Sequence, residues 1–501
     1  MELIILPLIL GIIAFFLPTN WVRPFGLLAS LSVLAVSVVH LMNFDPANYV
    51  LILNPAEVFP LGLTFKMGYD GLALVMVLLT NAVISIILLA NWNRDISSNA
   101  RFTGLVLLMQ CALLGLFTSL DGILFYTFWE LTLIPIFLIL YWFGKQDNNR
   151  ALFKFFLYTL LGSLMMLLSF IGLAYFSPNF SYFQLVQANF DGKAVEAAMI
   201  MGGILFAFAV KIPLFPFHTW QAPTYTNAPM AGTMLLSALM LKMALYGMIK
   251  WMIPIGFEGL VYLKWPVITL GGIGIVYGAI IAMKQKDLKT LFAYASISHL
   301  GLIAAGIMLF TVSAIEASMV QIINHSIVAV ALFLCAGIIE DRLNTRNIDD
   351  LGGIAKVAPH FGFWFAVITF ISVSVPFTAG FIGEFVLIKE LFTAHWVIGI
   401  TAASTLVFGA VYMLRAYQGS MFGPTKVTVF KDLTWNEYAV FGILTLAAVG
   451  FGLAVTFIAK GSSSSAIMTM TTMRFTTFII AIFLFIKYRT FGGFTKKDIP
   501  L

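Results

Sequence analysis

Charged side chains are scarce in this sequence. Only 10% of the 501 residues are Asp, Glu, Lys or Arg, whereas 61% are hydrophobic. In soluble globular domains, about a quarter of the residues are charged and roughly half are apolar. Disordered chains are poor in apolar residues. The composition therefore excludes a soluble enzyme and a disordered chain. It indicates an integral membrane protein.

Cysteines and motifs for substrate chemistry are equally scarce. The two cysteines, Cys111 and Cys335, lie inside apolar runs, which excludes both a disulfide scaffold and an iron–sulfur cluster with its four thiolates. The sequence has no Gly-rich phosphate loop, no zinc-spaced ligands and no nucleophile–base pattern. The histidines within apolar runs are too few for two haems. We therefore expect no cofactor or metal on this chain, and the scattered basic residues do not suggest nucleic acid.

Long apolar runs dominate what is present. A membrane-spanning helix needs about 20 apolar residues. The sequence predicts an all-α polytopic membrane protein with about 14 transmembrane helices and a possible fifteenth near residues 466–488. The first run has no basic leader and no small-residue cleavage site, so we expect it to be retained. The predicted spans lie near 3–17, 22–42, 70–91, 103–119, 122–143, 152–176, 196–216, 231–253, 260–283, 288–310, 313–339, 360–390, 396–420 and 436–458.

The loop charges predict the orientation of these spans. With the N-terminus outside, the inner loops hold fifteen Lys and Arg residues and the outer loops six, counted up to Lys460. Positive charge is enriched in cytoplasmic loops, so we expect the N-terminus on the outer, positive side. Lys250 and Lys284 stand near span ends, where lysine side chains commonly extend to the interface.

Prolines interrupt two of the predicted spans. Pro213 and Pro216 lie in the seventh span and Pro376 lies in the twelfth, and proline breaks a helix because it lacks a backbone donor. Each broken span is the fourth of a set of five, helices 4–8 and 9–13, which predicts two inverted repeats of a transporter. We expect four regions: N-terminal helices in 1–102, repeats in 103–253 and 254–422, and C-terminal helices with a tail in 423–501.

A few ionisable residues lie deep inside the predicted spans. Charge within a bilayer is costly, so each such residue is a functional candidate. His218 follows the first break, and we interpret it with Pro213, Pro216 and Pro376 as part of a gate or hinge. The candidates for carrying protons are Glu130, Lys211, Lys242, His299, His325 and Glu384.

Several stretches resemble the antiporter-like membrane subunits of respiratory complex I, the NADH-quinone oxidoreductase. The resemblance covers nearly the whole chain up to about residue 455. In that family a glutamate on the twelfth helix, here Glu384, is typical of the M type, also called chain 4. The matching stretches are Phe128–Glu130, Ala209–Pro213, Phe217–Trp220, Asn227–Thr233, Lys242 with Tyr246 and Gly247, Asp287–His299 and Phe381–Phe385.

The resemblance implies a proton-translocating subunit of a translocase in an energy-transducing inner (cell) membrane. Quinone reduction elsewhere in the complex would drive protons along the buried Glu, Lys and His residues. Glu130 would keep Lys211 charged until a neighbouring subunit draws Glu130 away. The implied partners are other membrane-arm subunits, above all the two paralogous antiporter-like subunits on either side. NADH, FMN, iron–sulfur clusters and quinone are expected on other subunits.

Two stretches depart from the family pattern, and two other functions stay open. The segment Gln221–Asn227 lacks the acidic residue and the histidine that usually follow Trp220, and the tail from Gly461 does not resemble the family's ending. One alternative is a subunit of a multisubunit cation/proton antiporter, although the nearest such subunits carry lysine where Glu384 stands. The other is a solitary solute transporter, which predicts a substrate pocket and independent uptake.

Overall fold

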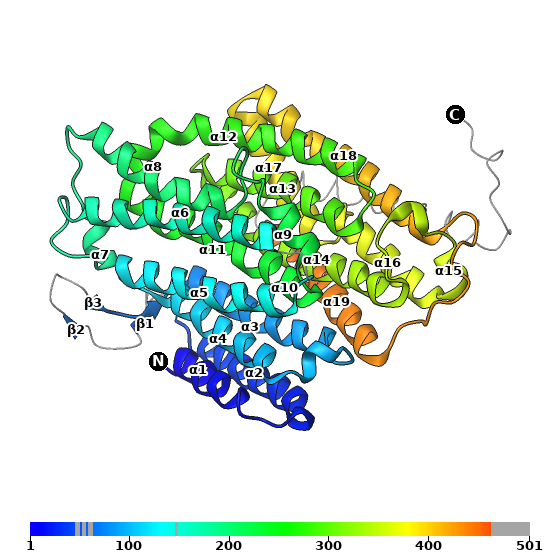
Figure 1. Cartoon of the computed structure of the whole chain (residues 1–501). Helices are drawn as coiled ribbons and strands as arrows, with labels where there is room; N and C mark the ends of the chain where they lie inside the picture. Colours follow the sequence, from blue (N-terminus) through cyan, green and yellow to red (C-terminus); the bar gives the residue numbers. More distant parts are fainter. Residues whose placement is uncertain (46–50, 53–56, 59–63, 146–148, 462–501) are drawn as a thin grey trace.

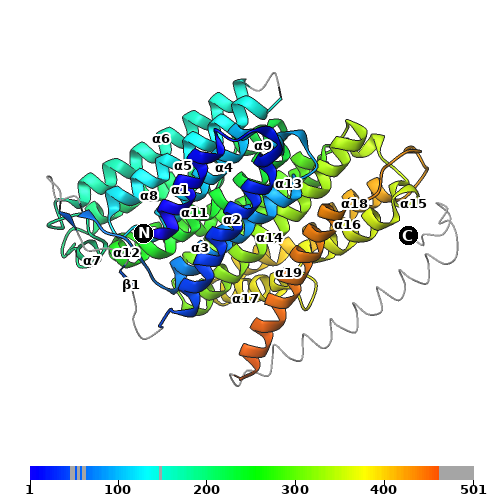
Figure 2. The ribbon, with the colours of Figure 1, turned by 90° about the horizontal axis from the view of Figure 1, so that it is seen from below.

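Long helices that run in one common direction make up the computed structural model, which describes residues 1–45, 51–52, 57–58, 64–145 and 149–461 (Figure 1, Figure 2). Among these residues, 11 helices are long and apolar enough to cross a membrane. Shorter apolar helices pack with them. The chain is therefore a nearly all-helical, multi-pass membrane protein.

The first third of the chain forms six helices and two short strand pairs. Strand β1 (Leu51–Ile52) pairs antiparallel with β4 (Gly68–Tyr69), and β2 (Glu57–Val58) with β3 (Thr64–Phe65). Aspartates fix two of the helix starts: Asp70 accepts a hydrogen bond from the Ala73 amide, and Asp121 caps the helix that follows it. The helices are α1 (Glu2–Ala14), α2 (Thr19–Met42), α3 (Gly71–Ala90), α4 (Ala100–Thr118), α5 (Gly122–Phe143) and α6 (Asn149–Leu173), with a short 3₁₀ turn, η2 (Asp95–Ser98).

The segment Met230–Lys284, in the middle of the chain, forms two helices that meet at a kink. It contains the predicted spans 231–253 and 260–283, and the turn expected between them is a kink at Gly256 (φ −129°, ψ 38°) rather than a loop. The segment also has two π-helical turns, both before the kink. Its parts are α10 (Met230–Leu235), the π turn η3 (Leu236–Met240), α11 (Leu241–Gly247), the π turn η4 (Met248–Met252) and α12 (Ile253–Lys284), and it follows α7 (Tyr182–Leu185), α8 (Ala194–Lys211) and α9 (Gln221–Asn227).

The last part of the chain packs around the most buried span, α14 (Val312–Leu343). Helix α14 contacts α13 and α17, and α12 packs along α13 and α18. The candidate span near 466–488 lies outside the described residues. The remaining elements are α13 (Leu288–Ile307), η5 (Ile348–Asp350), α15 (Ile354–Val357), α16 (Pro359–Ser372), α17 (Ala379–Ala394), α18 (Trp396–Met421) and α19 (Trp435–Gly461).

Two non-helical gaps stand where the prolines predict interruptions. Helix α8 ends at Lys211 and α9 begins at Gln221, with Pro213 at φ 31° between them. Helix α16 ends at Ser372 and α17 begins at Ala379, and residues 374 and 377 in that gap have positive φ. The first gap therefore begins inside the predicted span 196–216 and runs past its end, whereas the second lies wholly inside the predicted span 360–390.

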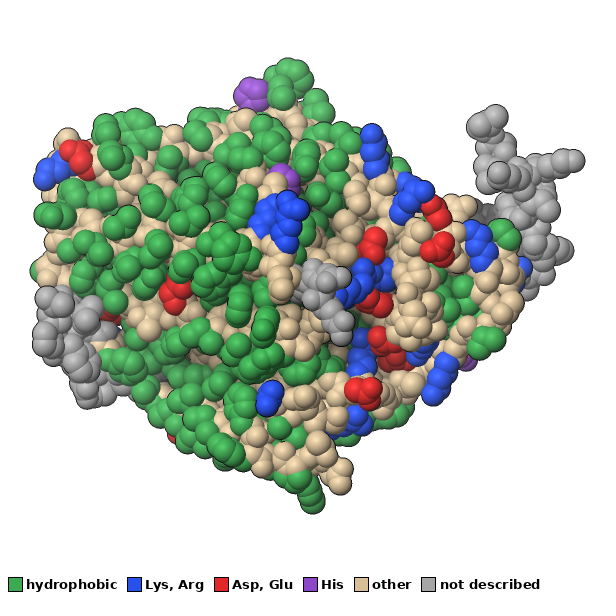
Figure 3. Space-filling view, in the orientation of Figure 1, with side chains coloured by type: hydrophobic (Ala, Val, Ile, Leu, Met, Phe, Trp, Pro, Cys, Tyr) green, Lys and Arg blue, Asp and Glu red, His purple; other side chains and the backbone are tan. Residues whose placement is uncertain are grey.

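The two ends of the bundle differ in chemistry. Acidic and basic side chains gather at one end, which we call the charged end, and the strands β1 and β4 lie at the other, which we call the strand end (Figure 1, Figure 3). The side between the two ends is mainly hydrophobic (Figure 3). Basic residues counted in the predicted inner loops form ion pairs with acidic residues at the charged end, among them Arg94, Lys145, Lys289, Arg342 and Arg346.

Candidate functional site

Lys242 lies at the centre of the bundle, on α11 directly after the π turn η3. Its side chain is completely buried (0% exposed). The ammonium donates to Nδ1 of His325 over 2.8 Å and to the carbonyl of Ser237. Within the described part of the chain, no carboxylate lies within 4.0 Å of it. The sequence prediction of a lysine far from water is therefore correct, and its direct partner is a histidine.

His325 connects two helices through its two ring nitrogens. Because an ammonium can only donate, Nδ1 accepts from Lys242 and Nε2 carries the proton. That Nε2–H faces the hydroxyl oxygen of Ser296 on α13, 2.9 Å away. Both His325 and Ser296 are buried. His325 thus has one nitrogen that can take a proton from Lys242 and another that can release one on the far side of the ring.

Glu384, which is buried, and His299, which is partly buried, form a second group. Glu384 lies in the second turn of α17, past the gap, and its Oε1 is 3.0 Å from Nδ1 of His299 on α13. Gln321 Nε2 donates to the same carboxylate oxygen over 3.0 Å, and Tyr412 lies 3.3 Å from Nε2 of His299. The carboxylate is 2% exposed. Helices α13, α14, α17 and α18 therefore place an acid and a base in direct contact.

A small cavity separates the two groups. It has a volume of about 30 Å³, and its lining is mainly apolar but includes both histidines, Ser296, Ser372 and Tyr412. The ring centroids of His299 and His325 are 6.3 Å apart. A cavity of this size has room for one water molecule, which can hydrogen-bond to the histidines and hydroxyl groups in the lining. Lys242, His325, His299 and Glu384 thus form one row, with the cavity at its middle.

Lys211 and Glu130 lie near each other without forming an ion pair. Lys211 is the last residue of α8 and is 2% exposed, and its ammonium is 5.4 Å from the ring centroid of Trp129. The charge of Glu130 acts on Lys211, yet no ion pair of 4.0 Å or less joins them among the described residues. One carboxylate oxygen of Glu130 is buried without a hydrogen-bond partner there. The aromatic ring supplies the direct contact to the ammonium.

His218 lies apart from this row. Its ring is stacked on Phe215 (centroids 5.5 Å apart) and meets Tyr277 edge-on (4.9 Å). Both ring nitrogens are buried, and neither has a hydrogen-bond partner in the described residues. Pro213 and Pro216 lie within the same gap. The structure thus places this histidine at a helix interruption, in an aromatic slot.

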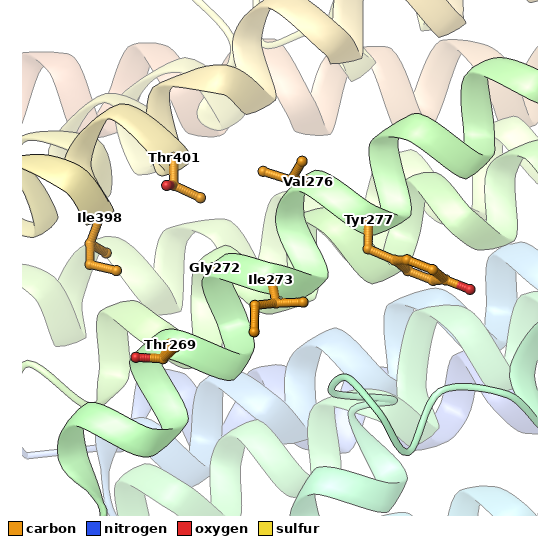
Figure 4. Close-up of a pocket in the computed structure, with 7 residues that line it drawn as sticks. All are labelled: Thr269, Gly272, Ile273, Val276, Tyr277, Ile398 and Thr401. Atoms are coloured by element: carbon orange, nitrogen blue, oxygen red, sulfur yellow. The ribbon is translucent and has the colours of Figure 1, made fainter.

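A larger groove opens beside that slot, on the outer face of α12 and α18. It has a volume of about 410 Å³ and is lined by Thr269, Gly272, Ile273, Val276, Tyr277, Ile398 and Thr401 (Figure 4). Tyr277 is the only lining residue with a titratable side chain, and it points away from the others (Figure 4). The larger hollow is therefore not where the buried charges meet.

Sequence reasoning missed a buried ion pair near the strand end. Lys250 does not extend to the interface as expected: it is 3% exposed, and its ammonium is 2.5 Å from Oδ2 of Asp70. The two residues are 180 positions apart, so no local pattern predicts that they pair. The available signal was Asp70, an acid that directly precedes a long apolar run.

A second network at the charged end holds the chain after α9. Lys289, at the inner edge of the predicted span 288–310, is 1% exposed and binds Glu340 (3.0 Å) and the Ala228 carbonyl (3.0 Å). Arg346 binds the same glutamate (2.9 Å) and the Thr226 carbonyl (3.1 Å). These cations neutralise the carbonyl end of α9. They fix the position of the segment that departs from the family pattern.

Within the described residues, no group of three or more His, Cys, Asp or Glu side chains is arranged to hold a metal ion. The membrane helices and the row of buried titratable side chains instead define a class: a polytopic membrane protein whose interior can accept and pass on protons. Comparison with known proteins identifies the family within that class.

The family described as "NADH:quinone oxidoreductase/Mrp antiporter, TM" matches residues 119–409. F(420)H(2) dehydrogenase subunit M from Methanosarcina mazei is 34% identical over 465 residues, which cover 90% of this chain and 94% of the relative. NADH-quinone oxidoreductase subunit M from Rhodobacter capsulatus is 32% identical over 448 residues, which cover 87% of both chains. The chain therefore belongs to the NADH:quinone oxidoreductase/Mrp antiporter family of membrane subunits.

Solved structures have the same fold. A chain of respiratory complex I from Thermus thermophilus superposes with a TM-score of 0.82 at 28% identity, covering 92% of this chain and 96% of that one. A chain of the Mrp complex from Dietzia sp. superposes with a TM-score of 0.80 at 19% identity, covering 91% and 95%. The second similarity concerns the fold alone.

Proposed function

We propose that this chain is an M-type, proton-translocating membrane-arm subunit of an NADH-quinone oxidoreductase. The observation that carries the proposal is the buried row from Lys242 through His325, the cavity and His299 to Glu384. The relatives named subunit M support the subunit type, and so does the glutamate at position 384. Because one of these relatives belongs to an F(420)H(2) dehydrogenase, similar membrane subunits serve complexes named for different electron donors.

Each step along the row transfers one proton between neighbouring groups. The Lys242 ammonium gives a proton to Nδ1 of His325, which releases the proton on Nε2 toward Ser296 and the cavity. A water in the cavity passes a proton to His299, and His299 passes it to Glu384. Chains of hydrogen bonds of this kind support transfer over distances too long for direct contact. Lys242 is then neutral and ready to take up the next proton.

The first pair of groups supplies that proton. A negative charge at Glu130 favours the protonated form of Lys211, because opposite charges attract strongly in a medium of low dielectric constant. When a neighbouring subunit draws the Glu130 side chain away, Lys211 loses this support and gives its proton toward Lys242. His218, with the flanking prolines Pro213 and Pro216, acts as the gate at the first gap, and the segment around Pro376 acts as the hinge at the second.

The remaining assignments follow from membership of the complex. The partners are the other membrane-arm subunits, with paralogous antiporter-like subunits on either side. The redox chemistry, with NADH, FMN, iron–sulfur clusters and quinone, takes place on other subunits. The chain lies in the energy-transducing inner (cell) membrane. Residues 103–253 and 254–422 form two inverted repeats, and the two gaps stand at corresponding places in them.

Labelling tests the orientation. We expect the N-terminus and the strand end on the outer side and the charged end on the inner side. A cysteine introduced in the 145–150 loop should stay unlabelled when an impermeant thiol reagent is added outside intact cells, and one in the 177–194 loop should react. The reverse pattern would contradict both the topology and the inverted repeats.

Co-purification tests the function itself. The other candidate is a subunit of a multisubunit cation/proton antiporter, because the description of the matching family also names the Mrp antiporter. A tag on this chain should retrieve subunits that carry flavin and iron–sulfur clusters. Retrieval of antiporter subunits without redox cofactors would support the alternative, and a lone chain with independent uptake would support a solitary transporter.

A further inference from the structure

Lys242 shares one helix face with two further titratable residues toward the strand end. Tyr246 and Lys250 follow it at intervals of four residues, and positions four apart lie on the same side of a helix. Tyr246 lies in α11 and Lys250 in the π turn η4. This face therefore offers a second direction for a proton, away from His325 and toward the strands.

The hydroxyl of Tyr246 is placed so that it cannot pass a proton on toward the strand end. It donates to the backbone carbonyl of Phe117 over 2.9 Å, and the side chain is completely buried. A backbone carbonyl oxygen only accepts hydrogen bonds and has no proton to release. A proton on the Tyr246 hydroxyl therefore cannot be passed on through this hydrogen bond. Aromatic rings fill the space beyond: Trp251 is 5.0 Å from Phe125 and 5.3 Å from Tyr182 between ring centroids.

The ion pair between Lys250 and Asp70 lies next. Asp70 is held twice, by Lys250 at Oδ2 (2.5 Å) and by the Ala73 amide at Oδ1 (2.8 Å). The Lys250 ammonium also lies 4.3 Å from the ring centroid of Tyr182. A proton that enters from the strand end meets either a carboxylate or a cation. Protonating Asp70 leaves a buried cation without its partner, which is costly, and a proton beside Lys250 is repelled.

We propose that Asp70, Lys250 and Tyr246 form a barrier that prevents protons from passing between Lys242 and the strand end. Lys242 then exchanges protons only with the row that leads through His325. The barrier rests on the proposed role of Lys242 as a proton carrier, and it assigns these three residues a positioning role rather than a carrying one. Its loss produces a leak of protons through the first repeat.

The test is a proton leak assay on the whole complex, reconstituted in liposomes without an electron donor. The variant Asp70→Asn with Lys250→Met removes both charges together, and asparagine keeps the helix cap. We expect an imposed proton gradient to collapse about tenfold faster than in the unmodified complex. This corresponds to a free-energy barrier to proton passage that is lower by about 1.4 kcal/mol. The single variant Lys250→Arg keeps the ion pair with Asp70, so its proton gradient should collapse as slowly as in the unmodified complex. An unchanged rate in the assembled double variant would overturn the proposal.

Two further variants complete the assay. Asp349→Asn with Lys286→Met removes an exposed ion pair of the same type (side chains 51% and 66% exposed) and should not change the leak. Tyr246→Phe removes only the hydroxyl; we expect a leak about threefold faster than that of the unmodified complex. If the double variant fails to assemble, an unchanged leak in Tyr246→Phe overturns the barrier. The leak needs no turnover, so its outcome is independent of whether the Glu384 row pumps.

Discussion

The two carboxylates of the candidate site differ in how they meet their basic partners. Glu384 lies 3.0 Å from His299 and accepts a hydrogen bond from Gln321. Glu130 forms no ion pair within 4.0 Å with Lys211 in the described residues, and the Trp129 ring lies beside the ammonium instead. We call the Glu384–His299 pair closed, because its two groups are in contact, and the Glu130–Lys211 pair open, because its two groups are not. A closed pair suits a site that holds a proton, and an open pair suits one that a neighbouring subunit can adjust.

The largest expected effect concerns the closed pair. Glutamine cannot bind or release a proton, so Glu384→Gln should lower proton pumping by about a hundredfold and, if coupling is tight, slow quinone reduction. Glu384→Lys restores a titratable group and should retain more activity than the glutamine variant. Pumping is measured in liposomes, after native gels have verified assembly.

Glu390→Gln is the matched control, because Glu390 lies on the same helix, is partly exposed and bonds Thr311. It should keep pumping. If an assembled Glu384→Gln complex pumps with unchanged stoichiometry, Glu384 does not lie on the path.

A smaller effect is expected in the middle of the row. His325→Leu removes the acceptor of the Lys242 proton and leaves that ammonium with only the Ser237 carbonyl. Pumping should fall about tenfold, whereas Ser296→Ala, which removes only the hydroxyl at Nε2, should reduce it less. Equal pumping in the leucine variant and the unmodified complex would show that protons bypass this histidine.

The smallest effect is expected at the open pair. Trp129→Leu removes the ring beside Lys211, a contact worth about 1 kcal/mol, and allows Glu130 to approach the ammonium. A closed first pair should hold the proton of Lys211 more tightly and slow pumping about threefold. Faster pumping in this variant would mean that the ring hinders transfer, contrary to the comparison above. Phe125→Leu, a change to a nearby ring that makes no contact with the ammonium in the described structure, serves as control.

Much of the fold was predictable because a bilayer restricts what a chain can do. Apolar runs of span length must form helices, since no water satisfies their backbone groups, and the structure has such helices where the runs lie. The prolines also predicted both gaps. The prediction for Lys250 was wrong because an interface position and a buried pair look alike in sequence. The assignment of protons to particular residues is a prediction that mutation must test.

The sequence by itself determined the class of protein and the burial of Lys211, Lys242, His325 and Glu384. These features follow from local properties of the sequence: the length of apolar runs, the positions of prolines and the charges inside predicted spans. None of these properties depends on a contact with a distant residue. Only the tertiary structure decided which of these groups meet. Lys242 bonds His325 across 83 residues, and Asp70 pairs with Lys250 across 180. The physical reason is that such a contact depends on how distant helices pack and rotate against each other, and neither partner's own sequence surroundings carry that information.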